Sequence, residues 1–160
     1  MPNWFDGYTE ISGSKKDLLS FLRSGVIQDG RYLNPIIKGD VLIYSKDEVP
    51  EGMYVTGTDG AFIGINSKRY KLEKNYRDNT YYFIGAWDQA WGVAISPIVE
   101  ICKRYNISIV IEGVEPIVGF EHYVHISSGG EVLENVMKDY DTVDYSENEF
   151  DEWGHPVKIK

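Results

Sequence analysis

Histidine and cysteine are the side chains of this 160-residue chain best suited to metal binding or nucleophilic chemistry. His122 and His125 lie three residues apart in a stretch with strand character, so their side chains should point to opposite faces of a sheet. Such a pair is not spaced to share a metal ion, and His155, beside Pro156, has no partner in the sequence. We therefore expect no metal site and no cofactor.

The single cysteine, Cys102, lies on the apolar stripe of a predicted helix. A small thiol in that position is expected to be buried, and no activating base can be assigned to it. Three glycines lack the strand-to-helix context of a phosphate-binding loop: Gly57, Gly60 and Gly64. The sequence therefore predicts a binding protein rather than an enzyme.

A cluster of carboxylates and aromatic rings near the C-terminus is the most distinctive feature of the chain. Seven carboxylates, with no Lys or Arg among them, account for most of the net charge of −9 and leave −2 for the other residues. They are Asp139, Asp141, Asp144, Glu147, Glu149, Asp151 and Glu152. Four rings accompany them: Tyr140, Tyr145, Phe150 and Trp153.

This acidic aromatic segment has two interpretations. Acidic tails often confer only solubility. Segments that are merely solvated have low hydrophobicity, however, so the rings favour a docking surface that packs on its own domain or on a basic partner. Carboxylates can imitate a phosphate backbone and occupy a basic nucleic-acid-binding cleft, with the rings as buried anchors. Direct binding to nucleic acid is disfavoured, because such binding requires cations.

A second segment combines cations with tyrosines and supports an alternative function, a small RNA or single-strand binder. Its candidate nucleic-acid-binding residues are Lys68, Arg69, Tyr70, Lys71, Lys74 and Arg77. Glu73 and Asp78 interrupt the segment, and alternation along a strand would divide it between two faces. Lysines also commonly protect solvated edge strands, which is the structural interpretation of the same pattern.

A third alternative concerns a predicted loop that contains Trp87, Asp88, Gln89 and Trp91. A helix N-terminus follows it, and free amide groups there favour anions, so the loop could bind a small anionic ligand. Alternatively, the rings pack on the sheet as a plug.

Two amphipathic helices and several strands are predicted around these residues. Ser14 is a good N-cap and Gly25 a helix end, so the first helix is expected between them. Ser96 and Pro97 predict the start of the second helix, with serine as its cap. Apolar alternation and β-branched runs predict strands at 6–12, 41–44, 53–56, 61–65, 70–72, 81–86, 107–111, 120–126 and 132–136.

These elements predict an α+β fold, a ferredoxin-like sandwich with two helices on one face of a mostly antiparallel sheet. The predicted body covers residues 1–136, with a β-rich insertion at about 26–80, and residues 137–160 form the acidic aromatic C-terminal segment. The length suits one domain with a hydrophobic core. The oligomeric state is left open, because an exposed strand edge can pair with a second copy or with a target.

The N-terminus has neither a basic region nor an apolar run, and no segment approaches the length of a bilayer span. We therefore expect a cytoplasmic protein with no membrane contact. A single cysteine also excludes an intramolecular disulfide.

Short motifs at both ends of the predicted body form a recognisable set. They are Met1-Pro2-Asn3-Trp4, Ile11-Ser12-Gly13, Ala86-Trp87 before Ser96-Pro97, and Glu115-Pro116 followed by Gly119-Phe120. In these motifs the chain resembles the Api92-like proteins of phages and plasmids, also called YubB-type ferredoxin-like proteins. Those proteins usually carry Cys where Phe5 stands here, and a compact Trp-Ser-Pro-Pro run that a stretch with Trp91 interrupts in this chain.

The resemblance implies a ferredoxin-like domain on a mobile genetic element and carries over no catalytic residue. Mobile elements encode many small acidic proteins that block host defences, including anti-CRISPR proteins. The leading hypothesis is therefore a non-catalytic inhibitor of a nucleic-acid-handling defence enzyme, which acts in the host cytoplasm. Its partner would be a host protein with a basic nucleic-acid-binding cleft, bound through the acidic aromatic segment.

Overall fold

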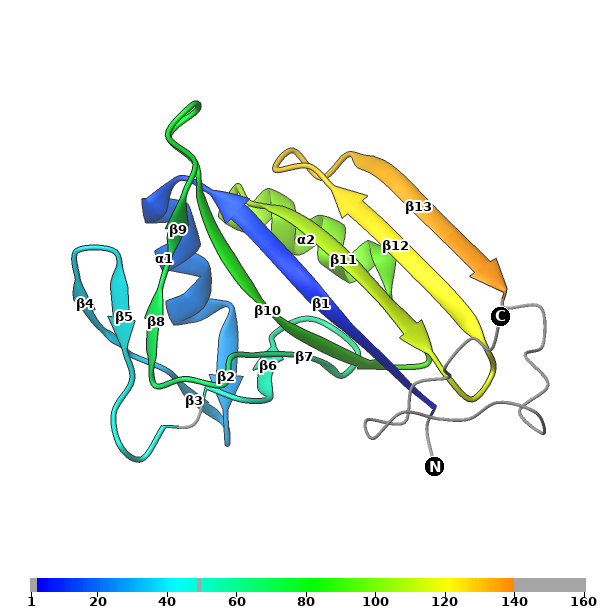
Figure 1. Cartoon of the computed structure of the whole chain (residues 1–160), viewed down its shortest axis with the longest axis horizontal. Helices are drawn as coiled ribbons and strands as arrows, with labels where there is room; N and C mark the ends of the chain where they lie inside the picture. Colours follow the sequence, from blue (N-terminus) through cyan, green and yellow to red (C-terminus); the bar gives the residue numbers. More distant parts are fainter. Residues whose placement is uncertain (1–2, 49, 140–160) are drawn as a thin grey trace, which may run out of the picture.

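The computed structural model describes residues 3–48 and 50–139 of the chain. Strands make up 49% and helices 15% of the structure, which has two helices and a ten-stranded antiparallel sheet. The predicted ferredoxin-like sandwich is therefore wrong. The physical reason is that strands from the 26–80 region pair with the main sheet and extend it, while the chain after the second helix adds a further edge strand (Figure 1).

The large sheet has the strand order β13-β12-β11-β1-β10-β7-β6-β2-β3, and β9 also pairs with β10. Its strands are β1 (Trp4–Gly13), β2 (Val26–Gln28), β3 (Arg31–Tyr32), β6 (Met53–Val55), β7 (Ala61–Gly64), β9 (Glu73–Lys74), β10 (Tyr81–Ala90), β11 (Ser108–Glu115), β12 (Phe120–Ile126) and β13 (Val132–Asp139). A second sheet has the order β4-β5-β8 and consists of β4 (Ile36–Lys38), β5 (Val41–Ile43) and β8 (Arg69–Lys71).

The first helix, α1 (Lys15–Ser24), has the ends that the sequence predicts. The Ser14 hydroxyl accepts a hydrogen bond from the Asp17 amide at 3.1 Å, and the Gly25 amide donates to the Phe21 carbonyl at 2.7 Å. Gly25 is also close to the Phe21 ring, which leaves little room for a side chain there. The prediction of this helix and of its cap is confirmed.

The second helix, α2 (Ile95–Tyr105), begins earlier than its predicted cap. Its N-cap is Ala94, and Ser96 lies within the first turn instead of capping it. The chain reverses direction directly after β10 through Trp91 and Gly92, both with positive φ, and this tight turn brings the helix start forward. None of the helices among the described residues is long and apolar enough to cross a membrane.

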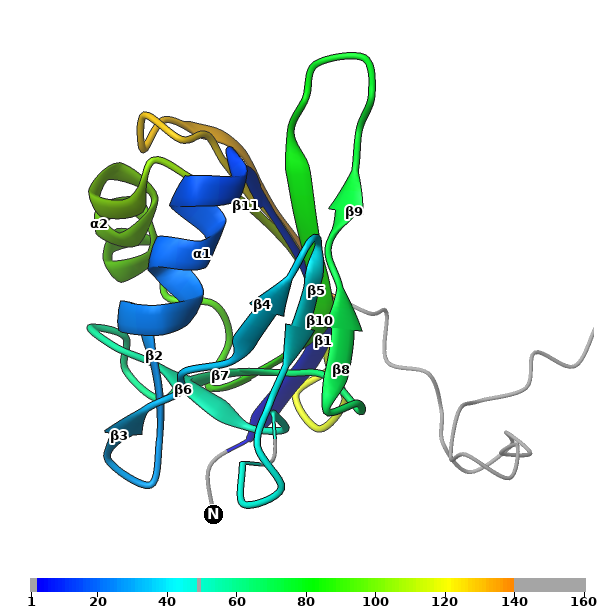
Figure 2. The ribbon, with the colours of Figure 1, turned by 90° about the vertical axis from the view of Figure 1, so that its left-hand side faces the viewer.

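Both helices cover the same face of the large sheet (Figure 2). Along β1, the buried residues Phe5, Thr9 and Ile11 face the helices, whereas the intervening side chains lie on the other side. Cys102 of α2 is fully buried in this core, and burial raises the pKa of its thiol to about 12. Among residues 3–48 and 50–139, no second layer covers β1 and β10–β13 on the side of the sheet opposite the helices, here called the open face (Figure 2).

Candidate functional site

The open face presents three rows of side chains that cross β13, β12, β11 and β1 in register. Because strands in this sheet are antiparallel, residues directly opposite each other point to the same face. The first row continues onto β10 and consists of Lys138, Glu121, Val114, Asp6 and Asp88. The second consists of Val136, Tyr123, Glu112 and Tyr8, and the third of Glu134, His125, Val110 and Glu10.

Six carboxylates gather in these rows and on five neighbouring strands. We call them the acidic face: Asp6, Glu10, Asp88, Glu112, Glu121 and Glu134. The rows contain one lysine, Lys138, opposite Glu121. The salt bridges found among residues 3–48 and 50–139 are Lys15–Asp40 and Lys103–Glu100, and neither touches this face. The acidic face therefore carries a surplus of negative charge.

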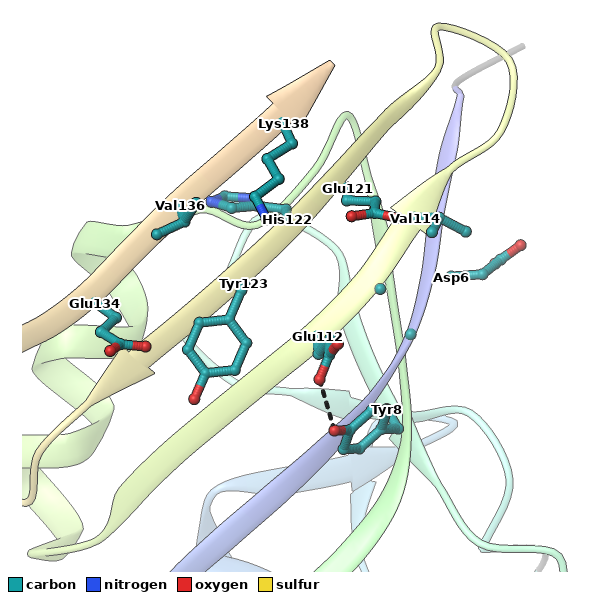
Figure 3. A pocket seen from close by; sticks show the side chains of 12 residues that line it. Asp6, Tyr8, Glu112, Val114, Glu121, His122, Tyr123, Glu134, Val136 and Lys138 are labelled. Carbon is teal, nitrogen blue, oxygen red and sulfur yellow. Dashed lines mark hydrogen bonds between the residues drawn. The ribbon is translucent and has the colours of Figure 1, made fainter. Parts of the chain in front are cut away.

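The negative charge of the acidic face contributes to raised pKa values of neighbouring groups. The Tyr8 hydroxyl donates to Glu112 at 2.7 Å, and this hydrogen bond raises the pKa of Tyr8 (Figure 3). Burial, and then the charges of nearby glutamates, raise the pKa of Tyr123. Burial, followed by the neighbouring Asp6, raises the pKa of Asp88. In each case nearby negative charge disfavours a further negative charge.

The centre of the acidic face is hollowed into an open groove of about 680 Å³. Tyr8, Glu112, Tyr123 and Glu134 lie along it on successive strands (Figure 3). Tyr8 is 49% exposed, so its ring offers contact area between the carboxylates. The groove thus combines a polar surface with rings that can be buried by a partner.

A hydroxyl group on β11 lies close to an imidazole group on β12. Ser108 Oγ lies 3.3 Å from His125 Nε2, but it donates its proton to the Ile126 carbonyl at 2.9 Å. A serine hydroxyl has one proton, and in this arrangement the Ile126 carbonyl accepts it. Within the described ranges, no group of three or more His, Cys, Asp or Glu side chains is arranged to hold a metal ion.

His122 and His125 lie on opposite faces of β12, as their spacing predicts. His122 is buried on the helix side, where its Nε2 lies 2.7 Å from Asn135 Oδ1 and its ring packs against Phe5 and Phe120. Its position is explained by packing and one hydrogen bond.

Most of the predicted C-terminal site lies outside the described residues. Asp139 is described, at the end of β13 and opposite Phe120. The other predicted partner-binding residues fall outside the description, as does His155: Tyr140, Asp141, Asp144, Tyr145, Glu147, Glu149, Phe150, Asp151, Glu152 and Trp153.

The structure divides the basic aromatic segment. Arg69 and Lys71 are exposed on β8, and the ammonium group of Lys68 donates to the Lys46 carbonyl. Tyr70 points the other way, where its hydroxyl donates to the Ile84 carbonyl at 3.0 Å and accepts from the Ile84 amide at 2.7 Å. Tyr70 is thus held by contacts within the fold and is not free to stack on a base.

The rest of that segment lies in a hairpin between β9 and β10 that projects from the body (Figure 2). Lys74 Nζ lies 5.3 Å from the ring centre of Tyr76 and 5.5 Å from that of Tyr81. Tyr76 is 84% exposed, and Arg77 follows it in the turn. A cation and an accessible ring therefore do come together at this hairpin.

The predicted loop before α2 is mostly strand, because β10 continues to Ala90. Trp87 is fully buried on the helix side, as the plug interpretation predicts, and Gln89 accepts a hydrogen bond from the Ala94 amide at 3.4 Å. Asp88 points to the open face, whereas Trp91 is 69% exposed in the turn. The four residues therefore do not converge.

Sequence reasoning missed the acidic face. A signal was present in the alternation of Asp6, Tyr8 and Glu10 along the first strand, which marks a polar strand face. The alignment of that strand with β10, β11 and β12 could not be read from the sequence, because register between distant strands depends on the whole sheet.

Comparisons with known proteins found no matching family model, no matching curated protein and no matching solved structure. The resemblance to Api92-like proteins remains an expectation from the sequence.

Proposed function

We propose that this chain is a non-catalytic binding protein that places its acidic face against a basic, nucleic-acid-binding cleft of a host defence enzyme and thereby inhibits that enzyme. The observation that supports this proposal is the register of six carboxylates across five adjacent strands, with one lysine among them. Charge of one sign, concentrated on one face, accelerates association with an oppositely charged partner and disfavours neutral or acidic ones.

The groove supplies the apolar part of such an interface. Tyr8 and Tyr123 stand between the carboxylates and can be buried by a partner, as tyrosines often are at binding hot spots. The arginine side chains of a nucleic-acid-binding cleft form strong, charge-assisted hydrogen bonds with carboxylates, as they do with phosphates. Residues 140–153 would extend the same acidic, aromatic chemistry from the end of β13.

A second candidate function, binding of RNA or single-stranded nucleic acid, rests on the β9–β10 hairpin. Tyr76 is exposed and has the ammonium group of Lys74 above its ring, the pairing that single-strand binders use for stacking and charge neutralisation. Asp78 accompanies these residues in the same hairpin, so the positive charge there is partly offset.

The test is a pull-down from host lysate with four tagged proteins. The first is wild type, and the second carries Glu10→Gln, Glu112→Gln and Glu121→Gln on the acidic face. The third is a control that neutralises three exposed turn carboxylates, Asp29→Asn, Asp47→Asn and Asp59→Asn. Both variants change the net charge from −9 to −6, so they differ only in where charge is lost. The fourth protein ends at Asp139.

We expect wild type and the turn variant to retain a nucleic-acid-handling enzyme that a DNA or RNA oligonucleotide displaces. The acidic-face variant should lose about tenfold or more in affinity, with a weaker dependence on salt. The proposed mode of inhibition would be rejected if the acidic-face and turn variants retained the enzyme equally. It would also be rejected if the oligonucleotide did not displace the enzyme. Retention of the purified protein itself on nucleic acid would favour the hairpin function instead.

A further inference from the structure

Strand β13 forms one end of the large sheet, and its outer edge faces no other strand within the described ranges. All eight of its residues are exposed, and four of them are large apolar side chains, between 42% and 56% exposed: Val132, Leu133, Val136 and Met137. Long sheet edges usually carry proline, several charges or a bulge that prevents pairing. β13 has no proline, its three charged side chains are of both signs (Glu134, Lys138 and Asp139), and its irregularity lies at its first residues, opposite His125 and Ile126.

The side chains of β13 alternate between the two faces of the sheet. Glu134, Val136 and Lys138 lie on the open face, opposite His125, Tyr123 and Glu121 of β12. Asn135 and Met137 lie on the helix side, opposite Val124 and His122 of β12, and Asn135 contacts the buried His122.

We propose that β13 pairs antiparallel with β13 of a second copy of this chain, about a two-fold axis at Val136. Opposite residues in an antiparallel pair share a face, so the axis of a symmetric pair must pass at a residue. With the axis at Val136, Glu134 of each copy lies opposite Lys138 of the other. Two oppositely charged pairs then flank a contact between the two Val136 side chains.

Other registers do not match these charges. An axis at Asn135 places Glu134 opposite Val136, and an axis at Met137 places Lys138 opposite Val136. An axis at Glu134 puts two like charges in contact, which destabilises a strand pair. The axis at Val136 is therefore the register in which Glu134 and Lys138, the charged side chains that β13 places on the open face, both lie opposite a residue of the other sign. Asp139, the third charged residue of the strand, lies opposite Leu133 in this register.

The same register also brings side chains of the two copies together on the helix side of the sheet. Met137 of each copy lies opposite Asn135 of the other on that side, so the two side chains can touch. The two large sheets become one continuous sheet, with both pairs of helices on one side and both acidic faces on the other. This assembly shares Glu134 with the acidic face, but the pull-down replaces no residue of β13, so the two proposals are tested by separate variants.

The test measures the dimerisation constant of the full chain by sedimentation over a wide range of concentration. We expect a dimer that Glu134→Lys or Lys138→Glu alone weakens about tenfold or more, since each creates like-charge contacts. The double variant Glu134→Lys with Lys138→Glu should restore the affinity, because the charges are exchanged but still complementary. A monomer at all concentrations would overturn the proposal, as would a double variant no better than the singles.

Cysteine cross-linking locates the axis independently. Val136→Cys should form a disulfide between copies under mild oxidation, since residues at the axis face themselves. Asn135→Cys is the matched control and should not, and native Cys102 is fully buried and will not interfere. Cross-linking through residue 135 rather than 136 would refute the register. A monomeric full chain that dimerises only after removal of residues 140–160 would show that the chain's own terminus occupies the edge, and would overturn the proposal.

Discussion

At the level of single residues, the acidic face contains one close pair of like charges. Asp6 and Asp88 lie directly opposite on β1 and β10, and burial together with Asp6 raises the pKa of Asp88. Residues that act within their own segment were predictable: the Ser14 cap, the burial of Cys102 and the opposite directions of His122 and His125 follow from local spacing. The Asp6–Asp88 pair was not, because its members are brought together by strand register rather than by sequence.

Replacing Asp88 with Asn should stabilise the fold at neutral pH by about 0.5 kcal/mol, the scale of exposed charge pairs. The folded-state pKa of Asp88 is raised above its ordinary value of 3.8. In the pH window between these two pKa values, the folded protein binds more protons than the unfolded chain. Stability is therefore lost as pH rises through the window, and Asn avoids this loss. Below the ordinary value both states are protonated, and the advantage of the variant should vanish. Urea unfolding at neutral and at strongly acidic pH measures both values.

Asp59→Asn, an exposed turn residue, is the control and should change stability little under either condition. A gain for the Asp88 variant that persists at acidic pH would show that packing, and not charge, is responsible.

At the level of elements, β1 and β11 approach each other unusually closely at a pair of glycines, Gly7 and Gly113. A Cβ on Gly113 would lie 2.5 Å from the Gly7 Cα and 2.8 Å from the Phe5 ring, and would also meet the Asp6 carbonyl. This contact supports the centre of the sheet beneath the acidic face. Most strands and α1 were predictable from local patterns. The fold class was not, because the order in which short strands of the 26–80 region join the sheet depends on tertiary pairing.

Gly113→Ala should destabilise the protein by about 1–3 kcal/mol, because the added methyl group must push apart backbone atoms of two paired strands. Gly129→Ala is the matched control. A Cβ there comes no closer than 3.8 Å to Ser127 Oγ, and its φ is not in the left-handed region, so we expect a change within about 0.5 kcal/mol. Urea denaturation of both variants measures the difference. Similar stabilities for the two would contradict the close approach of β1 and β11.

At the level of the whole molecule, charge is distributed unevenly. Five neighbouring strands carry the acidic face, whereas Arg69, Lys71, Lys74 and Arg77 belong to β8 and the β9–β10 hairpin. Mutual repulsion among carboxylates on one rigid surface opposes folding, because the unfolded chain separates these charges. Repulsion within the acidic face therefore lowers the stability of the folded protein, a cost that is common at binding surfaces.

Salt should relieve this repulsion, and the position of the charges should decide by how much. Raising ionic strength from about 0.01 M to 1 M shortens the Debye length from about 30 Å to about 3 Å, which screens neighbouring exposed carboxylates from one another. We expect wild type to gain about 1 kcal/mol, or about 2–4 °C in melting temperature. The acidic-face variant (Glu10→Gln, Glu112→Gln, Glu121→Gln) should gain about half as much.

The turn variant (Asp29→Asn, Asp47→Asn, Asp59→Asn) has the same net charge of −6 as the acidic-face variant. General effects of salt on hydrophobic burial and on the C-terminal carboxylates are common to both variants, so the difference between them isolates the acidic face. The turn variant should therefore respond to salt like wild type in thermal unfolding. Equal responses of the two variants would mean that the six carboxylates do not interact strongly enough to act as one surface, which would remove the electrostatic basis of the proposed partner binding.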